Sequence, residues 1–234
     1  MYCDGIAVSN KLDMRHRYRR ELPMLQASPV GGQAPGRRRE RGQSMVEMAL
    51  ITPVLILILA ALVELGMLAN NYIAVLDAGR EGARFGASGD PMFRENNPDC
   101  GTTLDYYMQI ACLVEQSMAP LTIDPTRDDI VISVFAIADG RVVARLPFET
   151  GENGWSRYGN RTSRFRSADI QALINPGDPP SGMVVVEVFY NHHQVLKLPF
   201  FTAFIPDPIP IRTYTIMPVS AAEPTPTPIP TASP

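Results

Sequence analysis

The sequence predicts an α+β protein: a long N-terminal transmembrane helix, then a small exported domain with antiparallel strands, with disordered termini. Three observations predict it. An apolar run follows a basic block near residue 42, β-branched stretches recur after residue 129, and a Pro/Thr-rich segment closes the chain. The 234 residues suffice for one membrane anchor and one modest domain.

The whole chain has a net charge of −3, but its N-terminal segment is basic and the remainder is acidic. Residues 1–36 hold charges, Pro and Gly without a period, so we expect a disordered leader. Basic arms can bind nucleic acid, but beside an apolar helix they are more often topology signals. We therefore expect no nucleic-acid partner, a cytoplasmic N-terminus, and residues after about Asn71 outside the cytoplasm.

Residues 45–76 are predicted to form one helix that continues to about Gly86. Its uncharged core, residues 48–63, rises roughly 24 Å, which is short for a bilayer core of roughly 30 Å. A span over about residues 46–69 is long enough and places Glu64 near one interface. Pro53 cannot donate to a helical carbonyl, but membrane helices tolerate Pro when neighbours satisfy the freed group.

A stripe of small residues lies farther along this helix, at Ala74, Ala78, Gly82 and Gly86. Such a stripe permits close approach of another helix. The alternative is a helix end that frays into residues 89–91. We favour the packing stripe.

Two helices and five strands are predicted in the exported domain, residues 89–220. The helices cover residues 103–119, by their helical period, and residues 167 to about 174, with Ser167 as a cap. The strands cover residues 130–137, 141–146, 183–190, 195–204 and 211–217. Asp139-Gly140 supplies a hairpin turn, and Pro199 makes residues 195–204 an edge or irregular partner of the strand before it. Residues 149–166 are expected to form a solvated loop with anchoring aromatics.

Little in the sequence indicates catalysis or metal binding. Cys100 and Cys112 fall in an oxidising compartment, where they either form a disulfide or remain two unrelated thiols. His192-His193 has no Cys or acidic neighbour in sequence, so we expect a turn and no metal. Since phosphate-loop, nucleophile-elbow and zinc-protease motifs are missing from the sequence, we expect neither an enzyme nor a cofactor.

Glu47 places a carboxylate inside the apolar zone, which costs roughly 2.5–3.5 kcal/mol at a helix centre and less near an interface. Cleavage after Gly42 would create a partner, because Gln43 would then carry a free α-amino group one helical turn away. The alternative is a plain anchor in which Glu47 reaches the cytoplasmic interface.

The run Arg41-Gly42-Gln43-Ser44-Met45-Val46-Glu47 resembles the class III signal of type IV prepilins, which are cut after a Gly and carry Glu as the fifth mature residue. With Pro53 and the later Val63-Glu64-Leu65-Gly66, residues 41–90 resemble the TadE-like family, pilin-like proteins of tight-adherence (Flp-type) pilus systems. Met48, where the family more often has Phe, and the long leader depart from the pattern.

The resemblance implies cleavage by a prepilin peptidase between Gly42 and Gln43, and pairing of Glu47 with the new amine of a neighbouring subunit. It implies other pilins, pilus-assembly membrane proteins and the lipid bilayer as partners. The expected role is a minor pilin or assembly component, single-pass in the cytoplasmic membrane or in a cell-surface pilus.

Four regions follow from these expectations: a cleaved leader (1–42), the pilin-like helix (43–88), the exported domain (89–220) and a flexible tail (221–234). The main rival is an uncleaved, signal-anchored, extracytoplasmic β-rich binding domain. A membrane-anchored enzyme ranks third.

Overall fold

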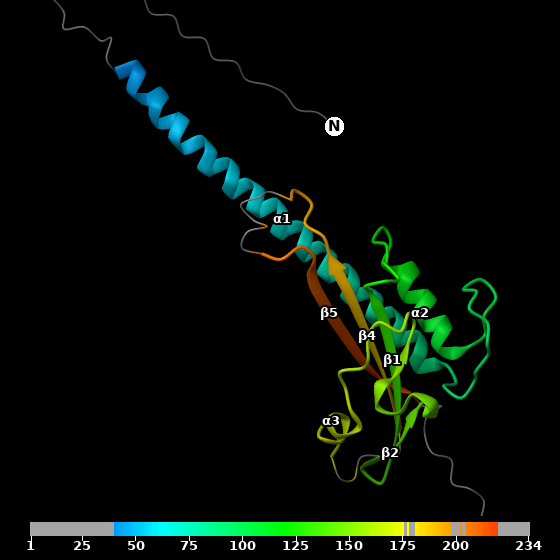
Figure 1. Cartoon of the computed structure of the whole chain (residues 1–234). Coiled ribbons are helices and arrows are strands. Elements are labelled where there is room, and N and C mark those ends of the chain that lie inside the picture. Colours follow the sequence, from blue (N-terminus) through cyan, green and yellow to red (C-terminus); the bar gives the residue numbers. More distant parts are fainter. Residues whose placement is uncertain (1–39, 176, 178–180, 198–201, 203–204, 220–234) are drawn as a thin grey trace, which may run out of the picture. The chain divides into compact units, whose positions relative to one another are not determined.

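The computed structural model describes residues 40–175, 177, 181–197, 202 and 205–219 (Figure 1). The chain divides into two units, residues 1–49 and 50–234. The expected leader of residues 1–36 and the tail of residues 221–234 lie outside the described residues.

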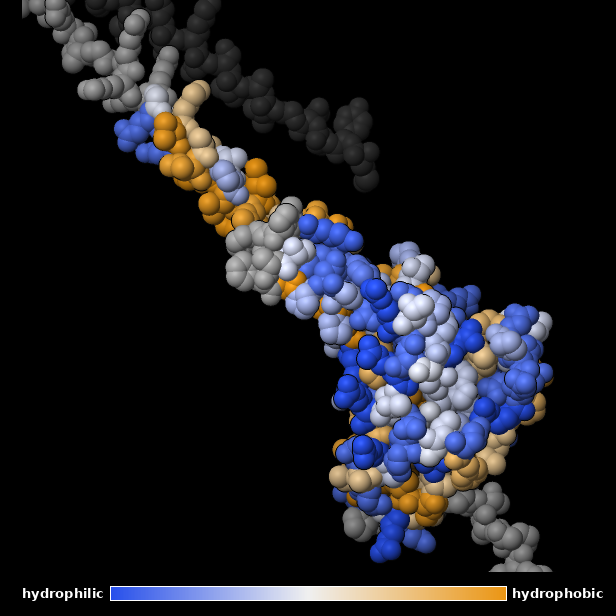
Figure 2. Space-filling view, viewed as in Figure 1, coloured by the Kyte–Doolittle hydropathy of each residue, from blue (hydrophilic) through white to orange (hydrophobic). Residues whose placement is uncertain are grey.

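Helix α1, Glu40–Ser88, contains Pro53 without interruption. Side chains at positions 42–63 are exposed, apart from two half-buried alanines, and most of them are apolar. Figure 2 shows this stretch as an apolar surface. By length and composition the helix can cross a membrane.

The second half of α1 is a core helix of the domain. Buried positions recur at intervals of three, four or seven residues, at Glu64, Asn71, Val75, Ala78, Gly82 and Gly86, and Gly79 and Ala83 beside them are buried as well. This spacing places them on one face of a helix. That face packs on the sheet and on α2, Tyr106–Ser117.

The sheet is antiparallel, in the order β2-β1-β4-β5, with β3 also paired to β1. The strands are β1 Asp129–Ala138, β2 Arg141–Leu146, β3 Trp155–Ser156, β4 Ser181–His192 and β5 Ile209–Val219. The β1–β2 hairpin turns at Asp139 and Gly140, which both have positive φ, as a two-residue type I′ turn requires. A larger core lies between the sheet and the helices α1 and α2. A smaller core beside α3, Ser167–Gln171, includes Phe135, Ile170 and Val185.

The α+β class is confirmed, and four of the five predicted strands lie within two residues of their expected limits. Helix α2 starts later than expected because Asp105 caps it, accepting a hydrogen bond from Met108 N at 3.0 Å. The cap of α3 is Arg166, and Ser167 is its first residue. Residues 149–166 contain all but the first residue of a 3-10 helix, η1 Phe148–Asn153, and the short strand β3, whose Trp155 pairs with Ile132.

Two expectations were wrong. The predicted strand at residues 195–204 is not formed by its described residues, 195–197 and 202; its other residues lie outside the described part. Both edges of β4 are already paired, with β1 and β5. His192 does not occupy a turn: it ends β4, pairs with Ile209 and is buried.

Candidate assembly helix and its contacts

Gly42, Gln43 and Glu47 lie in the first turns of α1. All three are exposed, and a Cβ placed on Gly42 would meet no atom within 4 Å. The Gln43 side-chain amide donates to Glu47 Oε1 at 3.4 Å, so the two side chains share one face. Pro53 is exposed farther along the helix.

Glu64 is buried, although it follows an apolar stretch whose side chains are mostly exposed. Its carboxylate accepts hydrogen bonds from the backbone N–H groups of Val195 (2.8 Å) and Leu196 (3.0 Å). These residues lie in the β4–β5 connection, where the sequence predicted a strand. The sequence singled out Glu64, but the tertiary structure supplies its partners.

A second polar contact joins α1 to the end of β4. Asn71 Nδ2 lies 2.8 Å from His192 Nδ1, and both residues are buried. Burial lowers the pKa of His192, against the opposing effects of the carboxylates of Glu64 and Asp207. A neutral ring with its hydrogen on Nε2 can accept the Asn71 amide hydrogen at Nδ1. No pattern in the sequence linked these two residues.

The small-residue stripe contacts elements of the same chain. A Cβ on Gly82 would overlap the side chain of Val114 in α2. A Cβ on Gly86 would lie 2.8 Å from Ile110 Cδ1, and Tyr106 donates its hydroxyl hydrogen to the Gly86 carbonyl at 2.8 Å. Within the stripe, Ala78 is buried and Ala74 half-buried.

Gly79, which the stripe did not include, faces the sheet. A Cβ there would lie 3.6–3.8 Å from Val188, Thr213 and Thr215. The close approach that the small residues permit is therefore used for α2 and the sheet.

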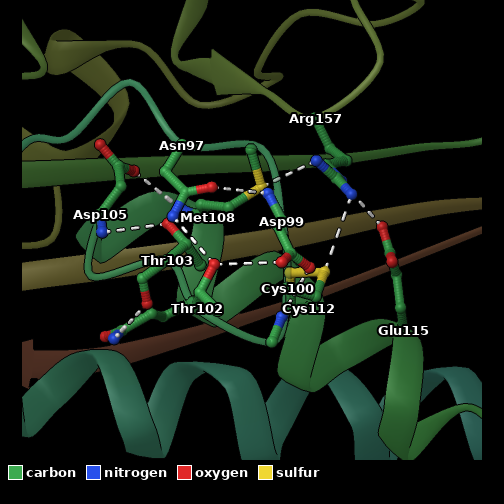
Figure 3. Close-up of a disulfide and its surroundings, with 12 residues drawn as sticks. Asn97, Asp99, Cys100, Thr102, Thr103, Asp105, Met108, Cys112, Glu115 and Arg157 are labelled. Atoms are coloured by element: carbon green, nitrogen blue, oxygen red, sulfur yellow. Dashed lines mark hydrogen bonds and ion pairs between the residues drawn. A yellow bond between two sulfur atoms is a disulfide. The ribbon is translucent and has the colours of Figure 1, made fainter.

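Cys100 and Cys112 form a disulfide with a Cα–Cα separation of 5.6 Å (Figure 3). It joins the loop before α2 to that helix. Asp99 orders the loop by accepting hydrogen bonds from Gly101 N and the Thr102 hydroxyl, both at 3.0 Å. These hydrogen bonds lower the pKa of Asp99.

Arg157 contacts the same region from the loop after β3. Its Nε donates to Glu115 at 3.0 Å, and its Nη2 lies 3.8 Å from Cys100 Sγ (Figure 3). Within the described residues, no group of three or more His, Cys, Asp or Glu side chains could hold a metal ion.

An exposed apolar helix segment, continuous with a helix packed on an antiparallel sheet, defines a membrane-anchored α+β protein. Residues 42–84 match the family model described as TadE-like protein, which confirms the resemblance of this segment. The match supports a pilus-associated, pilin-like protein with a membrane helix. No curated protein and no solved structure matches the chain significantly.

Proposed function

We propose that this protein is a minor pilin or assembly component of a tight-adherence pilus, inserted by α1 after its leader is removed. The observation that carries the proposal is the division of α1. Residues 42–63 present exposed, mostly apolar side chains, whereas the helix from Glu64 onward is built into the folded domain.

The length of the exposed part of α1 supports this role. After the cut, residues 43–63 rise about 31 Å at about 1.5 Å per residue, enough for a bilayer core of about 30 Å. The anchor therefore needs no residue beyond Val63, and the domain begins where the anchor ends. The basic leader keeps its side of the helix in the cytoplasm and the domain outside.

Cleavage between Gly42 and Gln43 creates an α-amine beside the Glu47 carboxylate. Both residues are exposed, so Glu47 is accessible to the amine of a neighbouring subunit as well as to its own. A pair of opposite charges lowers the cost of placing Glu47 in an apolar environment. In a filament, the amine of a neighbouring subunit takes the place of the subunit's own amine as the partner of Glu47.

The test is the mature mass and N-terminal sequence of the protein in cells that carry the prepilin peptidase, together with its recovery in sheared pili. Gly42→Leu should keep the leader, because a bulky residue blocks the cut, whereas the matched Gly42→Ala should be processed. Wild-type protein that keeps residues 1–42 would overturn the proposal and leave the uncleaved anchored domain.

Glu47 is tested separately from processing. Glu47→Ala and Glu47→Gln remove the charge, so both should insert at least as well as wild type but fail to enter pili. Ser44→Ala in the same exposed part of the helix is the matched control and should assemble. Normal assembly of both Glu47 variants would show that the charge pair is not used.

A further inference from the structure

The packing of α1 on the sheet defines which end of the sheet lies toward the anchor. Asn71 contacts His192 at the end of β4, whereas Gly86, farther from the anchor, lies against Val184 near the start of β4. Ile209 at the start of β5 pairs with His192. The end of β4 and the start of β5 therefore form the membrane-proximal end of the domain.

An arginine-rich cavity opens at this end. It has a volume of about 140 Å³ and is lined by Arg161, Arg164 and Arg212 together with Phe189, Tyr190 and Ile211. Arg212 bonds to the buried Glu187 at 2.8 Å. Arg161 and Arg164 are exposed, and their guanidinium groups form no ion pair within the described part of the chain.

Buried carboxylates hold the loop that carries Arg161 and Arg164. Arg161 N donates to Asp129 Oδ2 at 2.7 Å, and Arg164 N donates to Glu187 at 3.1 Å. Asp129 and Glu187 are fully buried. Toward the loop both carboxylates accept from backbone N–H groups, so the guanidinium groups of Arg161 and Arg164 remain available, and Glu187 also pairs with the Arg212 side chain.

Exposed apolar side chains lie at the same end of the domain. In the β4–β5 connection, Val195 is 53% exposed and Leu196 is 40% exposed, although Glu64 holds their backbone. Tyr72, one residue past Asn71 on α1, is also exposed. Apolar and aromatic side chains beside cationic ones are typical of surfaces that lie in a lipid headgroup region.

We propose that the membrane-proximal end of the domain binds anionic phospholipid headgroups, with the phosphate held by Arg161, Arg164 and Arg212. This proposal rests on the proposed function, because it requires α1 to span the bilayer. The guanidinium fork matches the geometry of phosphate oxygens. The partner is a membrane because α1 continues from this end directly into the apolar segment.

The expected magnitude follows from the charges. Each arginine near an anionic leaflet changes the ratio of docked to undocked domain by about fivefold. Removing Arg161 and Arg164 should therefore lower that ratio by about 25-fold. Salt should also lower the ratio of docked to undocked domain, since 1 M salt reduces the screening length to about 3 Å.

The experiment reconstitutes the full chain, carrying Val195→Trp, in bilayers whose lipids are brominated next to the headgroup. One bilayer contains phosphatidylcholine only, and the other also contains phosphatidylglycerol. Quenching of the new Trp should be stronger in the anionic bilayer and weaker at 1 M salt. Trp155, the one native Trp, is present in every sample and contributes a constant background.

Two double variants are compared in the anionic bilayer. Arg161→Gln/Arg164→Gln should lose the additional quenching. The control Arg84→Gln/Arg141→Gln removes the same charge away from this end and should retain it. Arg141 follows the turn beside Ala138, at the opposite end of β1, and Arg84 lies close to the distal end of α1.

Equal quenching in the two bilayers, or equal loss in the two double variants, would overturn the proposal. In the anionic bilayer, inorganic phosphate should reduce the Trp quenching of wild type more than that of the Arg161→Gln/Arg164→Gln variant. An equal reduction in both would also overturn the proposal. If the chain does not float with either bilayer, the membrane anchor itself is wrong, and the proposed function fails with it.

Discussion

Replacing Glu64 with Ala should release the β4–β5 connection while leaving the rest of the domain folded. The two backbone N–H groups of Val195 and Leu196 donate to this carboxylate at 2.8 and 3.0 Å. A hydrogen bond to a charged group contributes about 1.5–3 kcal/mol. Partial exposure at the loop reduces this, so we take about 2 kcal/mol for the pair together. That changes the opening equilibrium of the loop by a factor of about 30.

The assay is hydrogen exchange, measured by mass spectrometry on a peptide that contains Val195 and Leu196, with the full chain in lipid nanodiscs. Exchange of these two amides should accelerate by about 30-fold in Glu64→Ala. The exchange rate in Glu64→Gln should lie between those of Glu64→Ala and wild type, because the one carbonyl oxygen of Gln can still accept a hydrogen bond.

Glu47→Ala is the matched control, since it removes an exposed glutamate from the same helix. It should leave the exchange of Val195 and Leu196 unchanged. Unchanged exchange in Glu64→Ala, or equal acceleration in the control, would refute the reasoning.

Three further predictions concern the domain. Gly82→Ala should lower its denaturant midpoint, because overlap in a packed core costs about 1–3 kcal/mol, whereas Gly66→Ala, whose Cβ meets nothing within 4 Å, should not. Reducing the Cys100–Cys112 disulfide, whose cysteines are 12 residues apart, should cost about 3 kcal/mol in the unfolding free energy; an unchanged midpoint under reductant would contradict this. Burial lowers the pKa of His192, so the unfolded chain binds its proton at higher pH than the fold does. Stability should therefore fall as pH drops below about 6.5, and His192→Gln should flatten that dependence in denaturant titrations.

Local patterns in the sequence were sufficient for most of the secondary structure. The β-branched run at residues 130–137 and the Asp139-Gly140 turn predict the β1–β2 hairpin to within one residue. The order of charge, Gly42, Glu47 and apolar residues indicated the TadE-like segment, which the family match covers. These patterns can be recognised without knowledge of the tertiary contacts, because they depend on neighbours within a few residues.

The tertiary structure decided which groups satisfy one another. Residues 195–197 had strand-like composition, but β4 had no free edge, and Glu64, far away in sequence, accepts two of the loop's backbone hydrogens. The small residues of α1 permitted a close approach, but only the fold selected α2 and the sheet as the surfaces approached. A buried backbone N–H group needs an acceptor, and a small residue permits another element to approach closely. Which acceptor or element takes that place depends on segments that lie far away in the sequence and fold beside it.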